Sequence, residues 1–128
     1  MSRIRASGNR DTELRMISIF RQHGITGWRR NTRVFGKPDF VFPREKIAVF
    51  VDGCFWHRHP ECKFAYTPKS RLTFWQRKFD NNVARDKAVI RTLRKSGWKI
   101  ARIWECELRR ARWPAIARRF ARLRMKHK

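Results

Sequence analysis

The segment F-V-D-G-C-F-W-H-R-H-P-E-C, residues 50–62, places metal-ligating side chains, aromatic rings and an acid directly after an apolar, strand-like run. Two other places complete it. Upstream, G-K-P-D (36–39) ends a loop at the edge of a second apolar run, and downstream Cys106 follows the strand-like I-A-R-I-W (100–104). We interpret the three places as one site, and the rest of the chain as the scaffold that assembles it.

Three residues of this segment, Cys54, His59 and Cys62, are possible zinc ligands within one tight turn, and Cys106 supplies a fourth if its strand ends beside them. A Cys3His set is typical of a closed, tetrahedral, structural zinc site, which leaves no position open for water. The spacing differs from that of a standard zinc finger. Buried free thiols therefore remain the alternative interpretation.

The composition indicates one folded, strongly basic domain spanning residues 1–128. There are 33 Lys and Arg residues against 10 Asp and Glu, a net charge of +23, together with six Trp and ten Phe. The aromatic content favours a packed core, and the charge favours a nucleic-acid partner, with a solvated basic face or a ribosome-type protein as the alternative. The apolar runs are far shorter than the ~20 residues of a membrane span, and no signal peptide is visible. We expect a cytoplasmic protein without a disulfide framework.

The pattern of apolar residues predicts alternating helices and strands. Residues 1–11 form a basic arm, and a helix follows from Thr12 to about His23. The other expected elements are strands at 40–42 and 46–51 paired as a hairpin, a long helix from Thr73 to Gly97, a strand at 98–104, and a basic helix within 109–128 that starts near Pro114. This order predicts an α/β fold with a small central mixed sheet flanked by helices.

The acid most typical of catalysis is Asp39, because a Pro-Asp pair at the start of a strand begins the P-D-x(n)-(D/E)-x-K pattern of Mg²⁺-dependent nucleases. Asp52 on the next strand would be the second acid, but Cys54 stands where that pattern has lysine. His57 lies close enough in sequence to act as the base instead. A turn or helix-cap role for Asp39 stays open.

Two aromatic pairs and one further acid have both structural and functional interpretations. Phe55-Trp56 and Phe74-Trp75 are either core residues or wedges that unstack a base step of a duplex, and the charge of the chain favours the wedge for Phe55-Trp56. Glu13 lies in the first turn of the predicted first helix, where a carboxylate also simply complements the helix dipole.

These segments together resemble the very short patch repair (Vsr) DNA mismatch endonuclease family over nearly the whole chain. The matching motifs are M-S-R-I-R (1–5), T-E (12–13), G-K-P-D-F-V-F-P (36–43), V-D-G-C-F-W-H (51–57), F-W (74–75), N-x-x-R-D (82–86) and G-W-K-I…W-E-C-E-L (97–108). The resemblance implies a variant of the restriction-endonuclease fold. It also implies Mg²⁺-dependent nicking of one strand 5′ to the thymine of a T:G mispair, which starts short-patch repair.

The resemblance also implies roles for individual residues. Asp39 matches the Mg²⁺-binding aspartate and Val51 the residue whose backbone carbonyl helps to hold that metal. His57 matches the proposed general base, and Glu13 a glutamate that orders water beside the metal. The remaining matches are the zinc ligands Cys54, His59, Cys62 and Cys106, the intercalating aromatics Phe55, Trp56 and Trp75, and Asn82 as a contact near the mispair.

The chain departs from the family pattern in two places. Asp52 stands where the best-known members have a second active-site histidine, which weakens the nick or reassigns the proton transfers, and the chain ends soon after one basic helix. We expect a monomer in the bacterial cytoplasm, associated with the nucleoid, that acts on double-stranded DNA and works with mismatch-repair proteins. The alternatives are a sequence-directed homing or mobile-element nuclease and a non-catalytic zinc-containing DNA-binding module.

Overall fold

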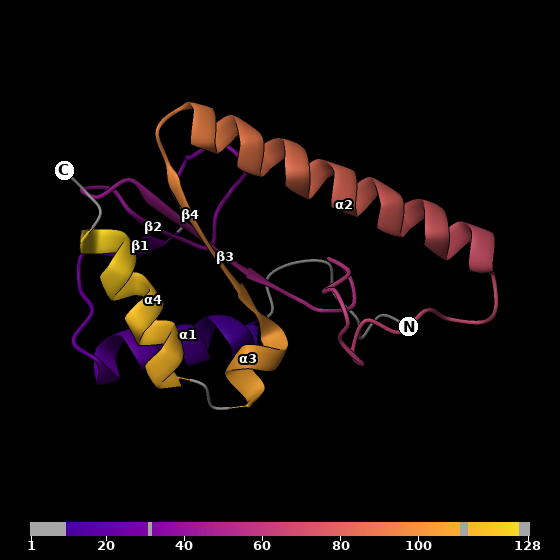
Figure 1. Ribbon diagram of the computed structural model, residues 1–128, viewed down its shortest axis with the longest axis horizontal. Coiled ribbons are helices and arrows are strands. Elements are labelled where there is room, and N and C mark those ends of the chain that lie inside the picture. Colours follow the sequence, from indigo (N-terminus) through magenta and orange to yellow (C-terminus); the bar gives the residue numbers. More distant parts are fainter. Residues whose placement is uncertain (1–9, 31, 111–112, 126–128) are drawn as a thin grey trace.

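The computed structural model describes residues 10–30, 32–110 and 113–125, in which one sheet carries helices on both faces (Figure 1). The elements in chain order are α1 (Arg10–Gln22), β1 (Arg29–Arg30), β2 (Phe40–Phe42), β3 (Ile47–Asp52), α2 (Leu72–Lys95), β4 (Lys99–Trp104), α3 (Glu105–Arg109) and α4 (Trp113–Met125).

The sheet has the order β1-β2-β3-β4 and is mixed, as the sequence predicts. β2 and β3 form the expected antiparallel hairpin, in which Phe42 pairs with Ile47. β3 and β4 run parallel, with Asp52 opposite Trp104, and α2 makes the long crossover that a parallel pair requires. Because parallel strands end at the same edge, the residues that follow β3 and β4 are brought together there.

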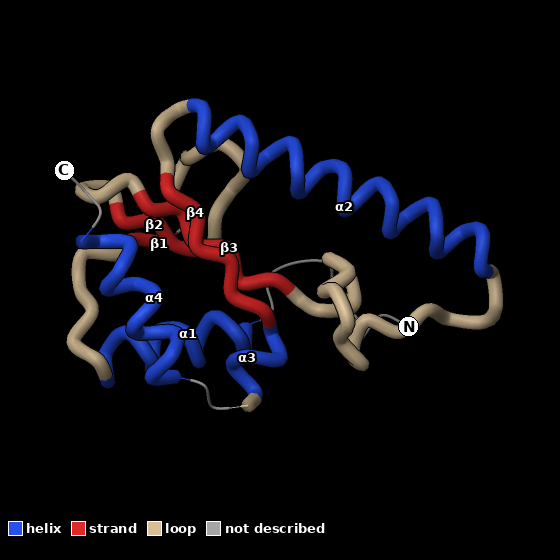
Figure 2. The backbone as a smooth tube through the Cα atoms, viewed as in Figure 1, coloured by secondary structure: helices blue, strands red, loops and turns tan. Residues whose placement is uncertain are grey.

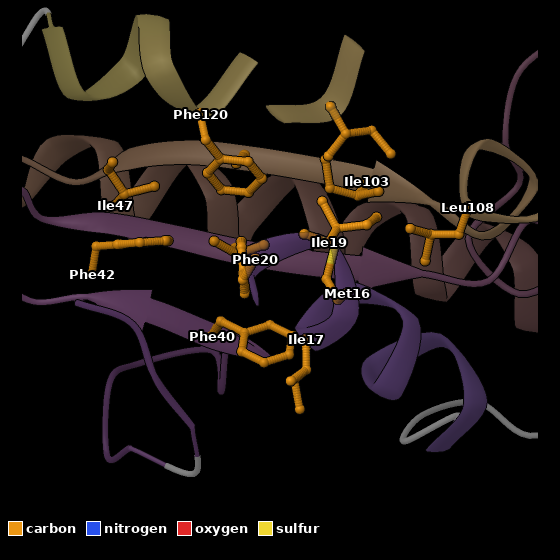
Figure 3. Close-up of a cluster of buried hydrophobic side chains, with 13 residues drawn as sticks. Met16, Ile17, Ile19, Phe20, Phe40, Phe42, Ile47, Ile103, Leu108 and Phe120 are labelled. Atoms are coloured by element: carbon orange, nitrogen blue, oxygen red, sulfur yellow. The ribbon is translucent and has the colours of Figure 1, made fainter. Parts of the chain in front are cut away.

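One face of the sheet is covered by α1, α3 and α4, and the other by α2 (Figure 2). The hydrophobic core lies on the first face, where side chains of α1 and α4 meet the inward-facing side chains of β2, β3 and β4 (Figure 3). Phe20 stands at its centre and packs edge-on against Phe40 and Phe120, with ring centroids 5.4 and 5.3 Å away. These buried rings fix α1 and α4 to the sheet.

The long helix α2 reaches past the end of the sheet and lies over the loop of residues 53–71 (Figure 1). Of its residues only Phe79 and Leu93 are buried, one toward each end. Gly36 fixes the loop before β2 against the same helix, because it has a φ of +80° and a Cβ added there would lie 2.4 Å from Cγ1 of Val89. A side chain at this position would be both strained and overpacked.

The structure differs from the sequence-based expectations at the ends of elements. α1 begins at Arg10, so the last two residues assigned to the basic arm belong to this helix; residues 1–9 of the arm lie outside the described residues. The five-residue helix α3 and the two-residue strand β1 are not resolved by periodicity, because neither is long enough to show a repeat. α4 begins at Trp113, one residue before Pro114.

No helix in the described ranges is both long and apolar enough to cross a membrane.

Candidate functional site

The predicted zinc ligands come together in space. Cys54 follows β3, His59 and Cys62 lie in the loop after it, and Cys106 projects from α3. Their four ligand atoms all lie within 4.8 Å of one another, and Cys106 Sγ is 3.4 Å from His59 Nδ1. Cys54 and Cys106 are buried, and His59 and Cys62 partly so. The cluster therefore has the composition and compactness of a Cys3His zinc site.

The chemistry of this cluster also fits a bound cation. Burial raises the pKa of the Cys54 thiol to about 12, and burial likewise raises that of Cys106. Three thiolates this close together repel one another unless a cation neutralises them. Zinc binding would release the thiol protons, and the binding free energy would then be available to the fold.

Asp39 lies immediately before β2, beside the end of β3. Its backbone N–H donates to the carbonyl of Val49 (2.9 Å), and its Oδ2 accepts a hydrogen bond from the N–H of Val51 (2.7 Å). Within a strand the N–H and C=O of one residue point to the same edge, so the Val51 carbonyl also faces the side of Asp39. Together they offer oxygen atoms, the donors that Mg²⁺ prefers.

The electrostatic surroundings of Asp39 suit a cation. Burial raises its pKa to about 7, while the Val51 N–H opposes the shift and the charges of Asp52 and Glu13 add to it. Glu13, on α1, forms an ion pair with Arg30 of β1 at 2.5 Å. Glu13 and Asp39 line one pocket of about 550 Å³ with the basic loop of residues 32–38. This pocket is large enough for a hydrated metal ion and a phosphate group.

His57 is held between two carboxylates. Its Nδ1 lies 2.6 Å from Asp86 Oδ2 and its Nε2 lies 3.7 Å from Asp52 Oδ1, which is too long for a hydrogen bond. Burial lowers the pKa of His57, but the hydrogen bond to Asp86 and the charges of both acids outweigh it, so the net shift is upward. With Nδ1–H donated to Asp86, Nε2 keeps its lone pair for a proton.

Asp86 and Arg102 are members of this network that the sequence did not single out as functional. Arg102 of β4 donates from Nε to Asp52 (2.6 Å) and from Nη2 to Asp86 (3.0 Å). Burial raises the pKa of Asp52, against which His57 and Arg102 act. The only sequence signal for Asp86 was its place in N-x-x-R-D. Arg102 had none, because the strand that carries it also carries a second basic residue, Lys99.

The aromatic residues expected to enter DNA form one cluster between the loop and α2. Phe55 is buried, with Trp56 and Trp75 partly exposed, and the ring centroids of these three residues lie 5.3 to 5.7 Å apart. Phe74, next to Trp75, is exposed and carries Arg71 over its ring at 4.4 Å. In this DNA-free arrangement Phe55 is a core residue of the cluster rather than an exposed wedge.

Asn82, on α2, contacts this cluster through the backbone of Trp56. Its Nδ2 donates to the backbone carbonyl of Trp56 at 3.3 Å. The indole N–H of Trp56 is buried and has no hydrogen-bond partner among the described residues. Such a donor destabilises its surroundings by about 1–3 kcal/mol, so Trp56 is held in the cluster less firmly than its burial suggests.

Comparison with known proteins gives consistent matches. The family model described as DNA mismatch endonuclease Vsr matches residues 1–63. The DNA mismatch endonuclease Vsr of Escherichia coli is 37% identical over 108 residues, which cover 83% of this chain and 69% of that protein. The type II nicking enzyme V.XorIIP of Xanthomonas oryzae is 47% identical over 73 residues, 57% of this chain and 53% of that enzyme.

A third relative is similar over a comparable length. The type II nicking enzyme V.NmeAIP of Neisseria meningitidis is 42% identical over 83 residues, 64% of this chain and 59% of that enzyme. The matched segments thus span between 53% and 69% of the length of these relatives.

Proposed function

Because the chain belongs to the Vsr family of DNA mismatch endonucleases, we propose that it nicks one strand of duplex DNA 5′ to the thymine of a T:G mispair and so initiates very short patch repair. Family membership also implies that the mixed sheet and its helices are a restriction-endonuclease-like fold. The observation that carries the proposal is that Asp39, Glu13 and His57 lie close together near the end of β3. The charge of Glu13 raises the pKa of Asp39 and the charge of His57 lowers it.

The residues of the site have separate tasks in this reaction. Water attacks phosphorus, the bond to the 3′ oxygen of the preceding nucleotide breaks, and the thymidine keeps a 5′-phosphate. His57 accepts the proton of the attacking water at Nε2, since Nδ1 is bound to Asp86. Glu13, which lines the same pocket as Asp39, orders water beside the metal.

The residues that would hold Mg²⁺ are Asp39 and the backbone carbonyl of Val51. When bound, Mg²⁺ supplies Lewis-acid stabilisation of the negative charge that develops on the phosphate oxygens. Asp39 has the properties of such a ligand because one of its oxygens is fixed by the Val51 N–H and its charge is poorly compensated by the protein.

Recognition of DNA would combine charge and stacking. The net charge of +23 attracts the phosphates without regard to sequence. Trp56 and Trp75 are partly exposed, and release of Trp56 from the cluster would free its unpaired indole N–H. Insertion of these rings beside a mispair is favoured because a mismatched step is already easier to unstack.

The test is a nicking assay on two synthetic duplexes that differ only in one T:G mispair, with and without Mg²⁺, using zinc-loaded protein. We expect Mg²⁺-dependent cutting of the thymine strand of the mispaired duplex alone, and its loss in Asp39→Asn with DNA binding retained. The exposed Asp80 of α2 gives a matched control, because Asp80→Asn removes the same charge outside the site. Binding without cutting by the unaltered chain would indicate a non-catalytic DNA-binding module.

A second candidate is a nicking enzyme directed to a fully paired sequence. It is favoured by the relatives that carry the name type II nicking enzyme. Equal cutting of the mispaired and the fully paired duplex would support this candidate against mismatch repair.

A further inference from the structure

The charge pattern around His57 is unusual for a general base, because both ring nitrogens face carboxylates. Asp86 is bound to Nδ1 at 2.6 Å and Asp52 lies 3.7 Å from Nε2. Two like charges this close repel each other and disturb the ring between them unless a cation compensates both. The compensating group is Arg102, which lies 2.6 Å from Asp52 and 3.0 Å from Asp86.

The contacts of Arg102 differ from those of an ordinary surface ion pair. Its Nη2 donates to Asp86 Oδ2, the same oxygen that lies 2.6 Å from His57 Nδ1. Its Nε binds Oδ2 of Asp52, so the planar fork spans both acids at once. A guanidinium can span two carboxylates in this way, whereas the point charge of a lysine cannot. The fork therefore fixes the rotation of the carboxylate that orients His57.

Arg102 is itself held in place by neighbours. Its guanidinium lies 4.3 Å from the centre of the Trp104 ring, and that ring stacks on the zinc-ligand candidate His59 at 4.2 Å. The backbone carbonyl of Arg102 accepts a hydrogen bond from Arg119 of α4 (3.1 Å). The guanidinium is thus packed on Trp104 and hydrogen-bonded to two acids while the backbone of Arg102 is held by α4, as a residue that fixes the geometry of a site must be.

We propose that Arg102 is the positioning residue of this active site: by clamping Asp52 and Asp86 it holds the His57 ring with Nδ1 toward Asp86 and Nε2 free. The negative charge of Asp52 is compatible with an ordered His57 ring only because this arginine compensates it. The inference rests on the proposed function for its consequence in catalysis, but the orientation of His57 is a property of the protein without DNA.

The test uses zinc-loaded Arg102→Gln and Arg102→Lys, with Arg94→Gln as control, since Arg94 is an exposed arginine of α2 whose loss removes the same charge. Single-turnover nicking by Arg102→Gln should fall by about 10- to 100-fold, the range typical when an outer partner of a functional group is lost. The dissociation constant for the mispaired duplex should match that of Arg94→Gln. Arg102→Lys should recover only part of the rate.

A second readout does not depend on nicking. Long-range ¹H–¹⁵N spectra report which nitrogen of each histidine ring carries hydrogen, with His57→Gln giving the assignment. We expect one ordered tautomer for His57 in the unaltered chain and in Arg94→Gln, and an averaged signal in Arg102→Gln while the His59 signal stays fixed. If Arg102→Gln does not fold, Arg102→Lys, which keeps the positive charge but not the planar fork, carries the same test, and its His57 signal should be averaged in part while that of Arg94→Gln stays ordered.

The outcomes separate the two proposals. An unchanged His57 signal and an unchanged rate in Arg102→Gln would overturn the positioning role while leaving the nicking function intact. A changed His57 signal in a chain whose unaltered form nicks no duplex would uphold the positioning role and overturn the proposed function.

Discussion

Replacing Asp39 by asparagine is expected to stabilise the zinc-loaded, Mg²⁺-free protein at neutral and alkaline pH while abolishing nicking. Burial raises the pKa of this carboxyl from its ordinary value of 3.8 to about 7. Each pKa unit corresponds to about 1.4 kcal/mol, so full ionisation of Asp39 lowers the free energy of unfolding by at most about 4 kcal/mol. Asparagine carries no charge and keeps an oxygen for the Val51 N–H.

The sign of the pH dependence follows from the upward direction of the shift. The folded chain binds the Asp39 proton more tightly than the unfolded chain, so this residue costs nothing below pH 3.8. Its destabilising effect grows between pH 3.8 and 7 and is constant above that. Between pH 6 and 8 the advantage of Asp39→Asn over the unaltered chain should therefore increase by about 1.4 kcal/mol.

The assay is urea unfolding followed by tryptophan fluorescence at pH 6, 7 and 8, with Asp80→Asn as the charge-matched control. A constant difference between Asp39→Asn and the unaltered chain at all three values would refute the reasoning. Mg²⁺ at ten times its dissociation constant should then stabilise the unaltered chain by about 1.4 kcal/mol. An equal gain in Asp39→Asn would refute Asp39 as the metal ligand.

Two further predictions concern the loops that carry the site. Cys62→Ser should reduce bound zinc to well below one ion per chain, measured by mass spectrometry, and lower stability by several kcal/mol, on the order of the contribution of a structural zinc; a variant that retains its zinc and its melting temperature would contradict the four-ligand site. Gly36→Ala should destabilise the fold by about 1–3 kcal/mol through its positive φ and its contact with Val89. Adding Val89→Ala should recover the part due to overpacking, and a melting temperature for Gly36→Ala equal to that of the unaltered chain would show that this loop does not pack on α2.

Much of the scaffold follows from the sequence because its signals are local. The apolar runs at 40–42 and 46–51, the helical stripe that begins near Thr73 and the stop at Gly97 each lie within one element, so their spacing alone predicts the sheet and the crossover helix. The cluster of candidate zinc ligands was predictable for a related reason. Three of them occur within nine residues of chain, residues 54–62, and only Cys106 had to be placed by the expectation that β3 and β4 end together.

The surroundings of His57, which are its hydrogen-bonding partner Asp86 and the arginine bound to that acid, were not predictable in the same way. Asp86 lies on α2 and Arg102 on β4, 29 and 45 residues beyond His57 in the sequence, and each is one charge among many in a chain with 33 Lys and Arg residues. Their roles depend on the register of β4 beside β3, which sets Arg102 opposite Phe50, two residues before Asp52. Packing of the whole sheet decides such a register, and a local sequence pattern does not reveal it.

The loop that carries His57 also needs contacts beyond its own sequence, and a bound zinc ion would supply some of them. Residues 53–71 form a long connection without helix or strand, a length at which loops in compact domains are usually mobile unless something else holds them. Arg58 supplies part of that hold, because its guanidinium donates to the carbonyls of Phe55, Ala65 and Tyr66 and lies 3.8 Å from the Phe79 ring.

His57 sits in this loop between two zinc-ligand candidates, Cys54 and His59, and the third and fourth ligands tie the loop to itself and to α3. A cation there would fix the backbone on both sides of the histidine, while Asp86 and Arg102 fix its ring. The metal cluster and the charge network then act together on the position of His57. One determines where the His57 backbone lies and the other determines how its ring points, and a general base requires both within a fraction of an ångström.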